Sequence, residues 1–186
     1  GTERDITKTI DLTIDAVSDA PVITAMAPYD GAIELDGVDD YIEIAYDASL
    51  ALSNFTIEAW VFHNELSDNS AIITKGANNS ESMEILTLAD GTVNAPLLLS
   101  TSGSREIISS APGIAKANIW QHYPLTYDGH SQFLYVDGQL VAEQALSQEI
   151  ALNTDSILIG AENVDGTIGR FLNGKVDDVR IYNRAL

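Results

Sequence analysis

An Asp-Gly pair at Asp137-Gly138 constrains the fold more than any other feature of this sequence. It separates two strand-like runs, residues 133–136 and 139–143. A two-residue hairpin turn needs positive φ, which Asp tolerates and Gly adopts freely, so the pair predicts a tight β-hairpin. A second Asp-Gly pair, Asp128-Gly129, closes the preceding run 118–127. Together these runs predict an antiparallel meander.

Short strand-like runs continue along most of the chain, separated by Gly, Asn and Asp, and no amphipathic helix of convincing length interrupts them. Many short strands with such turn residues are typical of a two-sheet antiparallel sandwich. We therefore predict an all-β fold. The expected strands cover residues 32–36, 40–45, 55–63, 71–75, 82–88, 93–100, 105–109, 118–127, 131–137, 139–144, 156–160 and 171–182.

The charge of the chain limits its partners. It has 28 acidic and 9 basic residues, a formal net charge of -19. Nucleic acid and anionic membrane surfaces would be repelled, so neither is expected as a partner. The surplus acid has two explanations, a solvated acidic surface or carboxylates that converge on Ca²⁺.

Cysteine usage and hydropathy bear on location. The chain has no cysteine, which excludes disulfides and thiol chemistry. No apolar run is long enough to span a bilayer, so membrane insertion is not expected. A eukaryotic extracellular domain would often carry at least one disulfide, so an extracellular protein of a bacterial cell surface fits better. Any export signal would lie outside this sequence.

The first 28 residues differ from the rest. Residues 10–15 alternate apolar and polar side chains, as in a strand, and Ala16-Val17-Ser18-Asp19-Ala20-Pro21 follows. This segment resembles the end of a cadherin-like or Ig-like repeat and its linker in large bacterial adhesins, although Ala16 and Ser18 replace the Asp and Asn of that pattern. We expect residues 1–28 to be such a repeat end plus linker, with neighbouring repeats of the same chain as partners.

Residues 29–186 resemble the LamG-like jelly-roll family of the concanavalin A-like lectin/glucanase superfamily. The resemblance implies a two-sheet antiparallel jelly-roll sandwich, a fold that hosts lectins, structural modules and hydrolases. It rests on four stretches in the family's order: Ala32-Ile33-Glu34-Leu35-Asp36-Gly37-Val38-Asp39-Asp40-Tyr41-Ile42-Glu43-Ile44, Phe55-Thr56-Ile57-Glu58-Ala59-Trp60-Val61, Trp120-Gln121-His122-Tyr123-Pro124-Leu125-Thr126-Tyr127-Asp128-Gly129 with the hairpin after it, and Gly174-Lys175-Val176-Asp177-Asp178-Val179-Arg180-Ile181-Tyr182-Asn183-Arg184-Ala185-Leu186.

The turn that contains Asp36, Asp39 and Asp40 is a first candidate calcium site. Ca²⁺ takes six to eight hard oxygen ligands, which such a loop supplies from carboxylates and free carbonyls. In family members the turn lies near the last strand, so the resemblance implies that Asp177 or Asp178 completes the site. The alternative is that these aspartates only cap turns.

A more distant resemblance to pentraxins, which are calcium lectins of the same superfamily, points to a second site. It brings the loop with Asn79 and Glu81 beside the loop with Glu162, Asn163 and Asp165. Carboxylates so close together would repel one another unless a cation joined them, so we expect Ca²⁺ at Glu81, Glu162 and Asp165. All five residues form the expected ligand site. The alternative is that polar loops merely solvate one end of the sandwich.

Aromatic and basic residues give weaker expectations. Trp60 and Trp120 lie within signature strands and are expected in the core. Residues nearer loops are candidates for ligand contact: Tyr29, Tyr46, His63, Arg105 and Arg170.

These patterns lead to a non-catalytic, Ca²⁺-dependent module of a bacterial adhesin that binds carbohydrate, or a peptide, on another cell or surface. One alternative is a structural spacer without a ligand. A second is a glycoside hydrolase, which needs two carboxylates spaced across the scissile bond. The nearest match, Glu34-Leu35-Asp36, is followed by Gly37 and lacks the next Glu of the glucanase motif.

Overall fold

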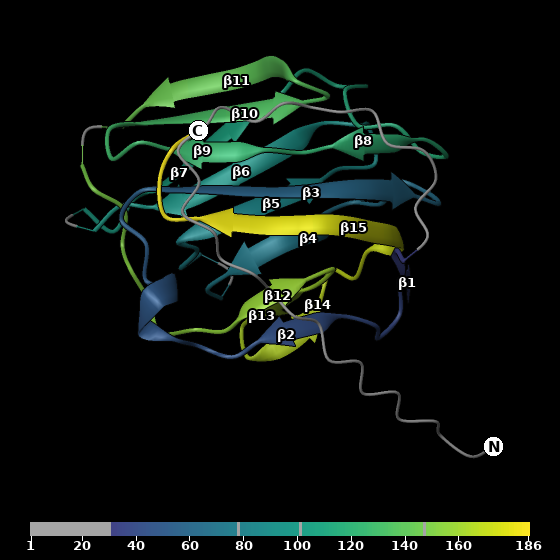
Figure 1. Cartoon of the computed structure of the whole chain (residues 1–186), viewed down its shortest axis with the longest axis horizontal. Coiled ribbons are helices and arrows are strands. Elements are labelled where there is room, and N and C mark those ends of the chain that lie inside the picture. The colour runs from purple at the N-terminus through teal and green to yellow at the C-terminus, as the bar shows by residue number, and fades with distance from the viewer. Residues whose placement is uncertain (1–30, 78, 101, 147) are drawn as a thin grey trace.

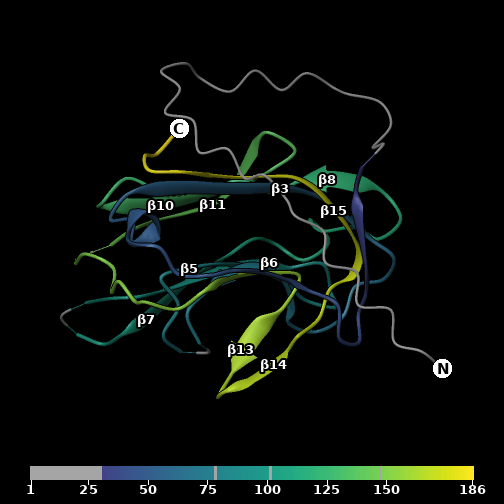
Figure 2. The same ribbon diagram turned by 60° about the horizontal axis from the view of Figure 1, so that its bottom comes forward.

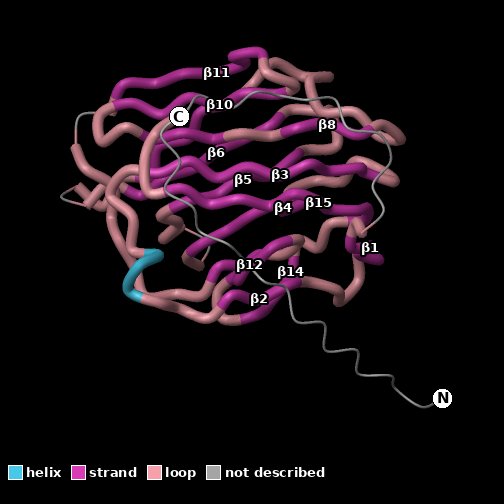
Figure 3. The backbone as a smooth tube through the Cα atoms, viewed as in Figure 1, coloured by secondary structure: helices cyan, strands magenta, loops and turns pink. Residues whose placement is uncertain are grey.

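The computed structural model describes residues 31–186, apart from residues 78, 101 and 147. The expected repeat end and linker at residues 1–28 therefore lie outside the described residues. Within the described ranges the regular structure is β-strand plus one 3-10 turn, η1 (Ala48–Leu50), as Figure 3 shows. No helix in this part of the chain is long and apolar enough to cross a bilayer.

Two antiparallel sheets form a sandwich, which confirms the predicted jelly roll (Figure 1). One sheet has seven strands: β1-β15-β3-β9-β10-β11 follow one another in that order, and β8 also pairs with β3. These strands are β1 (Ile33–Asp36), β15 (Asn173–Tyr182), β3 (Phe55–His63), β9 (Leu125–Tyr127), β10 (Ser131–Val136), β11 (Gln139–Ala145) and β8 (Trp120–His122). The other sheet runs β2 (Ile42–Ile44), β12 (Ile157–Ile159), β4 (Ser70–Lys75), β5 (Met83–Thr87), β6 (Val93–Leu98) and β7 (Arg105–Ser109).

A separate hairpin of β13 (Glu162–Val164) and β14 (Thr167–Gly169) projects from the six-stranded sheet, away from the other sheet (Figure 2). Its turn is Asp165-Gly166, with φ of 52° and 90°. Asp137-Gly138, between β10 and β11, has φ of 50° and 76°, which confirms the hairpin predicted there. The second hairpin uses the same turn chemistry.

Alternation along β3 builds the core. Phe55, Ile57, Ala59 and Val61 are fully buried between the sheets. The six-stranded sheet supplies the facing layer of apolar side chains. It includes Ile73, Met83, Ile85, Val93, Ala95, Leu97, Ile157 and Ile159.

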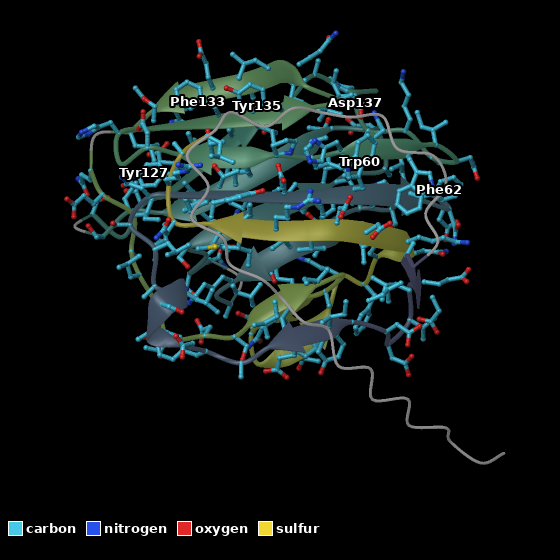
Figure 4. The ribbon with its side chains drawn as sticks, in the orientation of Figure 1. Trp60, Phe62, Tyr127, Phe133, Tyr135 and Asp137 are labelled. Atoms are coloured by element: carbon cyan, nitrogen blue, oxygen red, sulfur yellow. The ribbon has the colours of Figure 1, made fainter. Side chains whose placement is uncertain are left out.

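The expectation that Trp60 and Trp120 belong to the core was wrong. Successive side chains of a strand point to opposite faces, so Trp60 lies on the outer face of β3, between the inward Ala59 and Val61. Its ring stacks on His122 of β8 at a centroid separation of 5.1 Å. Phe62, two residues after Trp60 on the same face of β3 (Figure 4), packs on Trp120 with ring centroids 5.7 Å apart.

Gly174 of β15 should tolerate no side chain. A Cβ on this residue would overlap the carbonyl oxygen of Phe62 on the paired strand, whereas a Cβ on Gly169 would meet no atom within 4 Å. We expect Gly174→Ala to lower the free energy of unfolding by about 1–3 kcal/mol. Gly169→Ala, the matched control, should change it by less than about 0.5 kcal/mol. Urea unfolding of both variants tests this, and equal effects would contradict the close approach.

Candidate functional site

Three glutamates meet on the outer face of the six-stranded sheet. Glu84 lies on β5 between Met83 and Ile85, which face the core, so its side chain points outward. Glu81 precedes β5, and Glu162 begins β13. All three are fully buried, and a carboxylate oxygen from each lies within 4.8 Å of those of the others. We call this group the glutamate cluster.

Two arginines compensate two of the three carboxylates. Arg105, the first residue of β7, donates from Nε to both carboxylate oxygens of Glu81 at 3.1 and 3.0 Å, and from Nη2 to Oε1 at 2.9 Å. Arg170 follows β14 and donates from Nη1 to Oε2 of Glu162 at 2.6 Å. Each arginine side chain is 24% exposed although its glutamate is fully buried. The arginines therefore lie between the cluster and solvent.

Glu84 is the member without an arginine of its own. Its nearest cation among the described residues is Nη2 of Arg105, at 3.7 Å. Burial raises the pKa of Glu84 well above its ordinary value, and the charges of Glu162 and Glu81 raise it further. Burial thus favours the neutral form of Glu84, while Glu81 and Glu162 are each paired with an arginine.

Local structure positions the cluster. Asn79, at φ of 68°, donates its backbone N–H to Oε1 of Glu81 at 2.8 Å, and the Glu81 carbonyl accepts from the N–H of Leu98 on β6. On the other side, the Arg170 carbonyl accepts the N–H of Ala71 on β4. The loop before β5 and the end of the β13–β14 hairpin are thus both tied to the sheet by backbone hydrogen bonds.

The structure brings together two of the five residues expected at the ligand site, Glu81 and Glu162. The exposed Asp165 is not in the glutamate cluster, because it occupies the Asp-Gly turn of the hairpin. Asn163 supports the same turn, since its Oδ1 accepts the N–H of Gly166 at 2.8 Å. Asn79 reaches the cluster through its backbone N–H, and the residue itself is exposed.

The turn at Asp36, Asp39 and Asp40 holds three exposed carboxylates within 4.8 Å of one another. Oδ1 of Asp36 accepts the N–H groups of Val38 and Asp39 at 2.7 and 3.2 Å, and these hydrogen bonds lower the pKa of Asp36. Asp40 in turn accepts the N–H of Asp36 at 3.2 Å. The aspartates therefore organise this turn through their own hydrogen bonds.

Asp178 does not complete that turn, contrary to expectation. Asp36 pairs with Asn173, and Asp178 lies five residues further along β15, about 17 Å away at 3.3–3.4 Å per residue. It sits where the pairing with β3 shifts register, at φ of 49°, and binds Nη2 of Arg180 at 2.9 Å. Asp177 lies only one residue closer to the turn.

A match to a family model establishes the family of this chain. A family model described as the concanavalin A-like lectin/glucanases superfamily matches residues 36–186. This chain belongs to that superfamily. No curated protein matches the chain.

Solved structures of similar fold include carbohydrate-binding proteins. The concanavalin A-like domain superposes on the CBM40 module of the Ruminococcus gnavus IT-sialidase bound to α2,3 sialyllactose, with a TM-score of 0.65 and 17% identity over 80% of this chain and 92% of that chain. The NanB sialidase of Streptococcus pneumoniae has a TM-score of 0.71 and 16% sequence identity, and the match covers 84% of this chain and 26% of that chain. A SAP-like pentraxin of Limulus polyphemus has a TM-score of 0.57 and 15% sequence identity, and the match covers 83% of this chain and 76% of that chain. At these identities the likeness establishes the fold alone.

Sequence reasoning missed Glu84 in the site of this concanavalin A-like domain. The sequence did carry a signal for it, because Glu84 is a single charged residue between the apolar Met83 and Ile85 of the expected strand 82–88. Arg105 and Arg170 were candidates for ligand contact, and both lie at the cluster. His63 is fully buried and so is not available to a ligand, Tyr46 lies over Nζ of Lys75 at 5.3 Å, and Tyr29 falls outside the described residues.

Proposed function

We propose that this domain is a non-catalytic carbohydrate-binding module whose ligand contacts Arg105 and Arg170 beside the glutamate cluster. The observation that carries the proposal is the pair of partly exposed guanidinium groups held by fully buried carboxylates. Among the described residues, Nη1 of Arg105 and Nε and Nη2 of Arg170 donate to no protein atom. These fixed donors remain available to a ligand.

A sialylated glycan is the ligand that we propose to test first. An arginine fork matches the geometry of a carboxylate, and sialic acid carries one. The CBM40 module of similar fold, with sialyllactose bound, supports the same choice. The net charge of -19 opposes an anionic ligand at long range, so binding should strengthen as added salt screens that repulsion.

Calorimetric titration with α2,3 sialyllactose tests the proposal. We expect Arg170→Lys, which keeps the charge but loses the planar fork, to weaken binding by about tenfold or more. Lys175→Gln is the control, because this lysine lies on β15 of the other sheet and is 41% exposed. Unchanged affinity in Arg170→Lys, or no binding by the unaltered domain, would contradict the proposed site; the second result favours the spacer alternative.

Hydrolysis is disfavoured by the spacing of the carboxylates. Glycosidases hold two carboxyl groups about 5–9.5 Å apart, with the scissile bond between them. One carboxylate oxygen from each of Glu81, Glu84 and Glu162 lies within 4.8 Å of the others. All three side chains are fully buried, and Arg105 and Arg170 cover Glu81 and Glu162, so a glycosidic bond does not fit between these carboxylates. We therefore propose that sialyllactose is bound but not cleaved.

Calcium enters this proposal at the turn of Asp36, Asp39 and Asp40. At the glutamate cluster, Arg105 and Arg170 already supply the positive charge that we had assigned to a cation, so Ca²⁺ would have to displace them. Within the described ranges, no arginine or lysine forms an ion pair with Asp36, Asp39 or Asp40. We propose a structural calcium there, and glycan binding that does not require it.

Thermal melting with Ca²⁺ or with chelator checks this role of calcium. A hundredfold excess of Ca²⁺ over its Kd should stabilise the domain by about 2.7 kcal/mol, or roughly 5–10 °C in Tm. Asp39→Asn should remove most of that gain, since Asp39 offers a carboxylate but only its backbone N–H is used in the turn. An equal gain in Asp39→Asn, or no gain in the unaltered domain, would rule out the ion.

The setting of the module is also a proposal. The absence of cysteine, the acidic composition and the adhesin-like sequence of residues 1–28 support a bacterial cell-surface protein with neighbouring repeats. Antibody labelling of intact cells tests this location.

A further inference from the structure

Lys75, the last residue of β4, is a buried lysine. Only 1% of its surface is exposed, although lysine is almost never fully buried unless it is paired. The ring of Tyr46 lies over Nζ, with its centroid 5.3 Å away. Among the described residues, Nζ donates to the backbone oxygen and to Oδ1 of Asn153, at 2.9 and 2.7 Å. The buried amine is thus held against the carboxamide of one residue.

Hydrogen bonds fix the orientation of that carboxamide. Asn153 precedes β12, the neighbour of β4 in the six-stranded sheet (Figure 1). Besides the Lys75 amine, Oδ1 accepts the N–H of Asp155 at 3.2 Å, and Nδ2 donates to the carbonyl of Ser80 at 3.0 Å. The chain also packs closely here, since a Cβ on Gly76 would lie 2.7 Å from Nδ2. The carboxamide therefore keeps its oxygen toward Nζ and its nitrogen toward Ser80.

Burial also favours the reactive form of Lys75. It lowers the pKa of the amine below its ordinary value, although the charge of Asp155 acts in the opposite direction. The nucleophile of a lysine is its neutral form, and desolvation is one way in which proteins activate it. The fold holds this amine beside a carbonyl group, and such a fixed intramolecular arrangement gives a high effective concentration.

We propose that Lys75 and Asn153 become joined by a covalent amide bond, which the folded domain forms by itself. Nζ attacks Cγ of Asn153 as an uncharged amine. The Nζ–Cγ bond forms, the Cγ–Nδ2 bond breaks, and Nδ2 leaves as ammonia with a proton that came from Nζ. One amine and one primary amide become one secondary amide and ammonia, so the reaction needs no oxidant, reductant or second substrate.

Asp155 assists this reaction in two ways. Its backbone N–H, 3.2 Å from Oδ1 of Asn153, stabilises the negative charge that develops on this oxygen when Nζ attacks. Its side chain is exposed, and no hydrogen bond or ion pair holds the carboxylate in the described part of the chain, so it is able to turn toward Nζ. There the carboxylate accepts the proton of the attacking amine and passes it to Nδ2.

The bond closes a long loop of the chain. Lys75 and Asn153 are 78 residues apart, and the loop between them contains β5 to β11, which belong to both sheets. A cross-link over such a loop stabilises a fold mainly by constraining the unfolded chain. The domain has no cysteine, so this amide bond supplies the kind of cross-link that a disulfide supplies elsewhere.

Intact-mass spectrometry of the purified chain, denatured before injection, tests the bond. The chain should be lighter than its sequence by the mass of one ammonia molecule, and a tryptic digest should contain a branched peptide that joins Lys75 to Asn153. Lys75→Arg and Asn153→Ala should each have the full sequence mass. Asp155→Ala keeps the N–H but loses the carboxylate, so its mass, followed over time, should fall about a hundredfold more slowly.

Lys175→Arg is the matched control, because Lys175 lies on the other sheet and is 41% exposed; this variant should lose ammonia as the unaltered domain does. The full sequence mass in the unaltered domain would overturn the proposal and leave Lys75 and Asn153 as a hydrogen-bonded pair. A loss of ammonia that persists in Lys75→Arg would overturn it too, since it would come from another reaction, such as succinimide formation at Asn173-Gly174. These masses are measured without a glycan, so they do not bear on binding at the glutamate cluster.

Discussion

Arg105→Met should lower the free energy of unfolding by about 3–5 kcal/mol, because it leaves the fully buried carboxylate of Glu81 without its bidentate partner. Without the Arg105 guanidinium, the uncompensated charge of Glu81 also lies close to Glu84 and Glu162. For a domain of this size the change corresponds to a fall in Tm of roughly 6–20 °C. Urea unfolding and thermal melting measure it.

Two further variants test the cause. Lys175→Met removes a cation whose side chain is 41% exposed and whose partner, Glu34, is 71% exposed, and it should cost no more than about 1 kcal/mol. Adding Glu81→Gln to Arg105→Met removes the orphaned charge and should restore part of the lost stability. If Arg105→Met costs as little as Lys175→Met, the glutamate cluster is not held by buried charge pairing.

His63→Leu should remove a large part of the acid sensitivity of the fold. His63 is fully buried, neither ring nitrogen has a hydrogen-bond partner among the described residues, and the ring packs edge-on to Tyr123 at 6.0 Å. Burial lowers the pKa of His63 from 6.5 to about 4. Below pH 6.5 the unfolded chain therefore binds a proton that the folded domain does not.

The direction of the pH dependence of stability follows from this difference in proton binding. Stability falls as the pH drops from about 6.5 to about 4, by roughly 3 kcal/mol in total for this one group. Urea unfolding at pH 7.5 and pH 4.5 should show a smaller loss in His63→Leu than in the unaltered domain, by about 2–3 kcal/mol. The exposed His130 supplies the control, since His130→Leu should leave the loss unchanged. The same loss in both variants would contradict a neutral, buried His63.

The strands could be read from the sequence because their signals are local. Residues 55–63 and 105–109 form strands with the expected bounds, since alternation and flanking turn residues define both. The expected strand 118–127 is instead two strands, broken around Pro124, which has no N–H to donate. The β13–β14 hairpin was missed although Asp165-Gly166 carries the same signal as Asp137-Gly138, because we interpreted Asp165 as a calcium ligand.

The site was predictable only in part, because its pairings join distant strands. The pentraxin resemblance placed Glu81 near Glu162, and the structure brings them together. Nothing local pairs Arg105 with Glu81 or Arg170 with Glu162, since those contacts depend on sheet order and on where β13 meets β4. The position of Asp178 likewise depends on a register shift in β15, which the sequence pattern does not reveal.

Amide chemical-shift mapping of the unaltered domain with α2,3 sialyllactose, in chelator, tests the central claim most directly. The account predicts shifts at Glu81, Arg105, Glu162 and Arg170, on the outer face of the six-stranded sheet, without any need for calcium. Shifts confined to the seven-stranded sheet, or shifts that appear only when Ca²⁺ is restored, would contradict it.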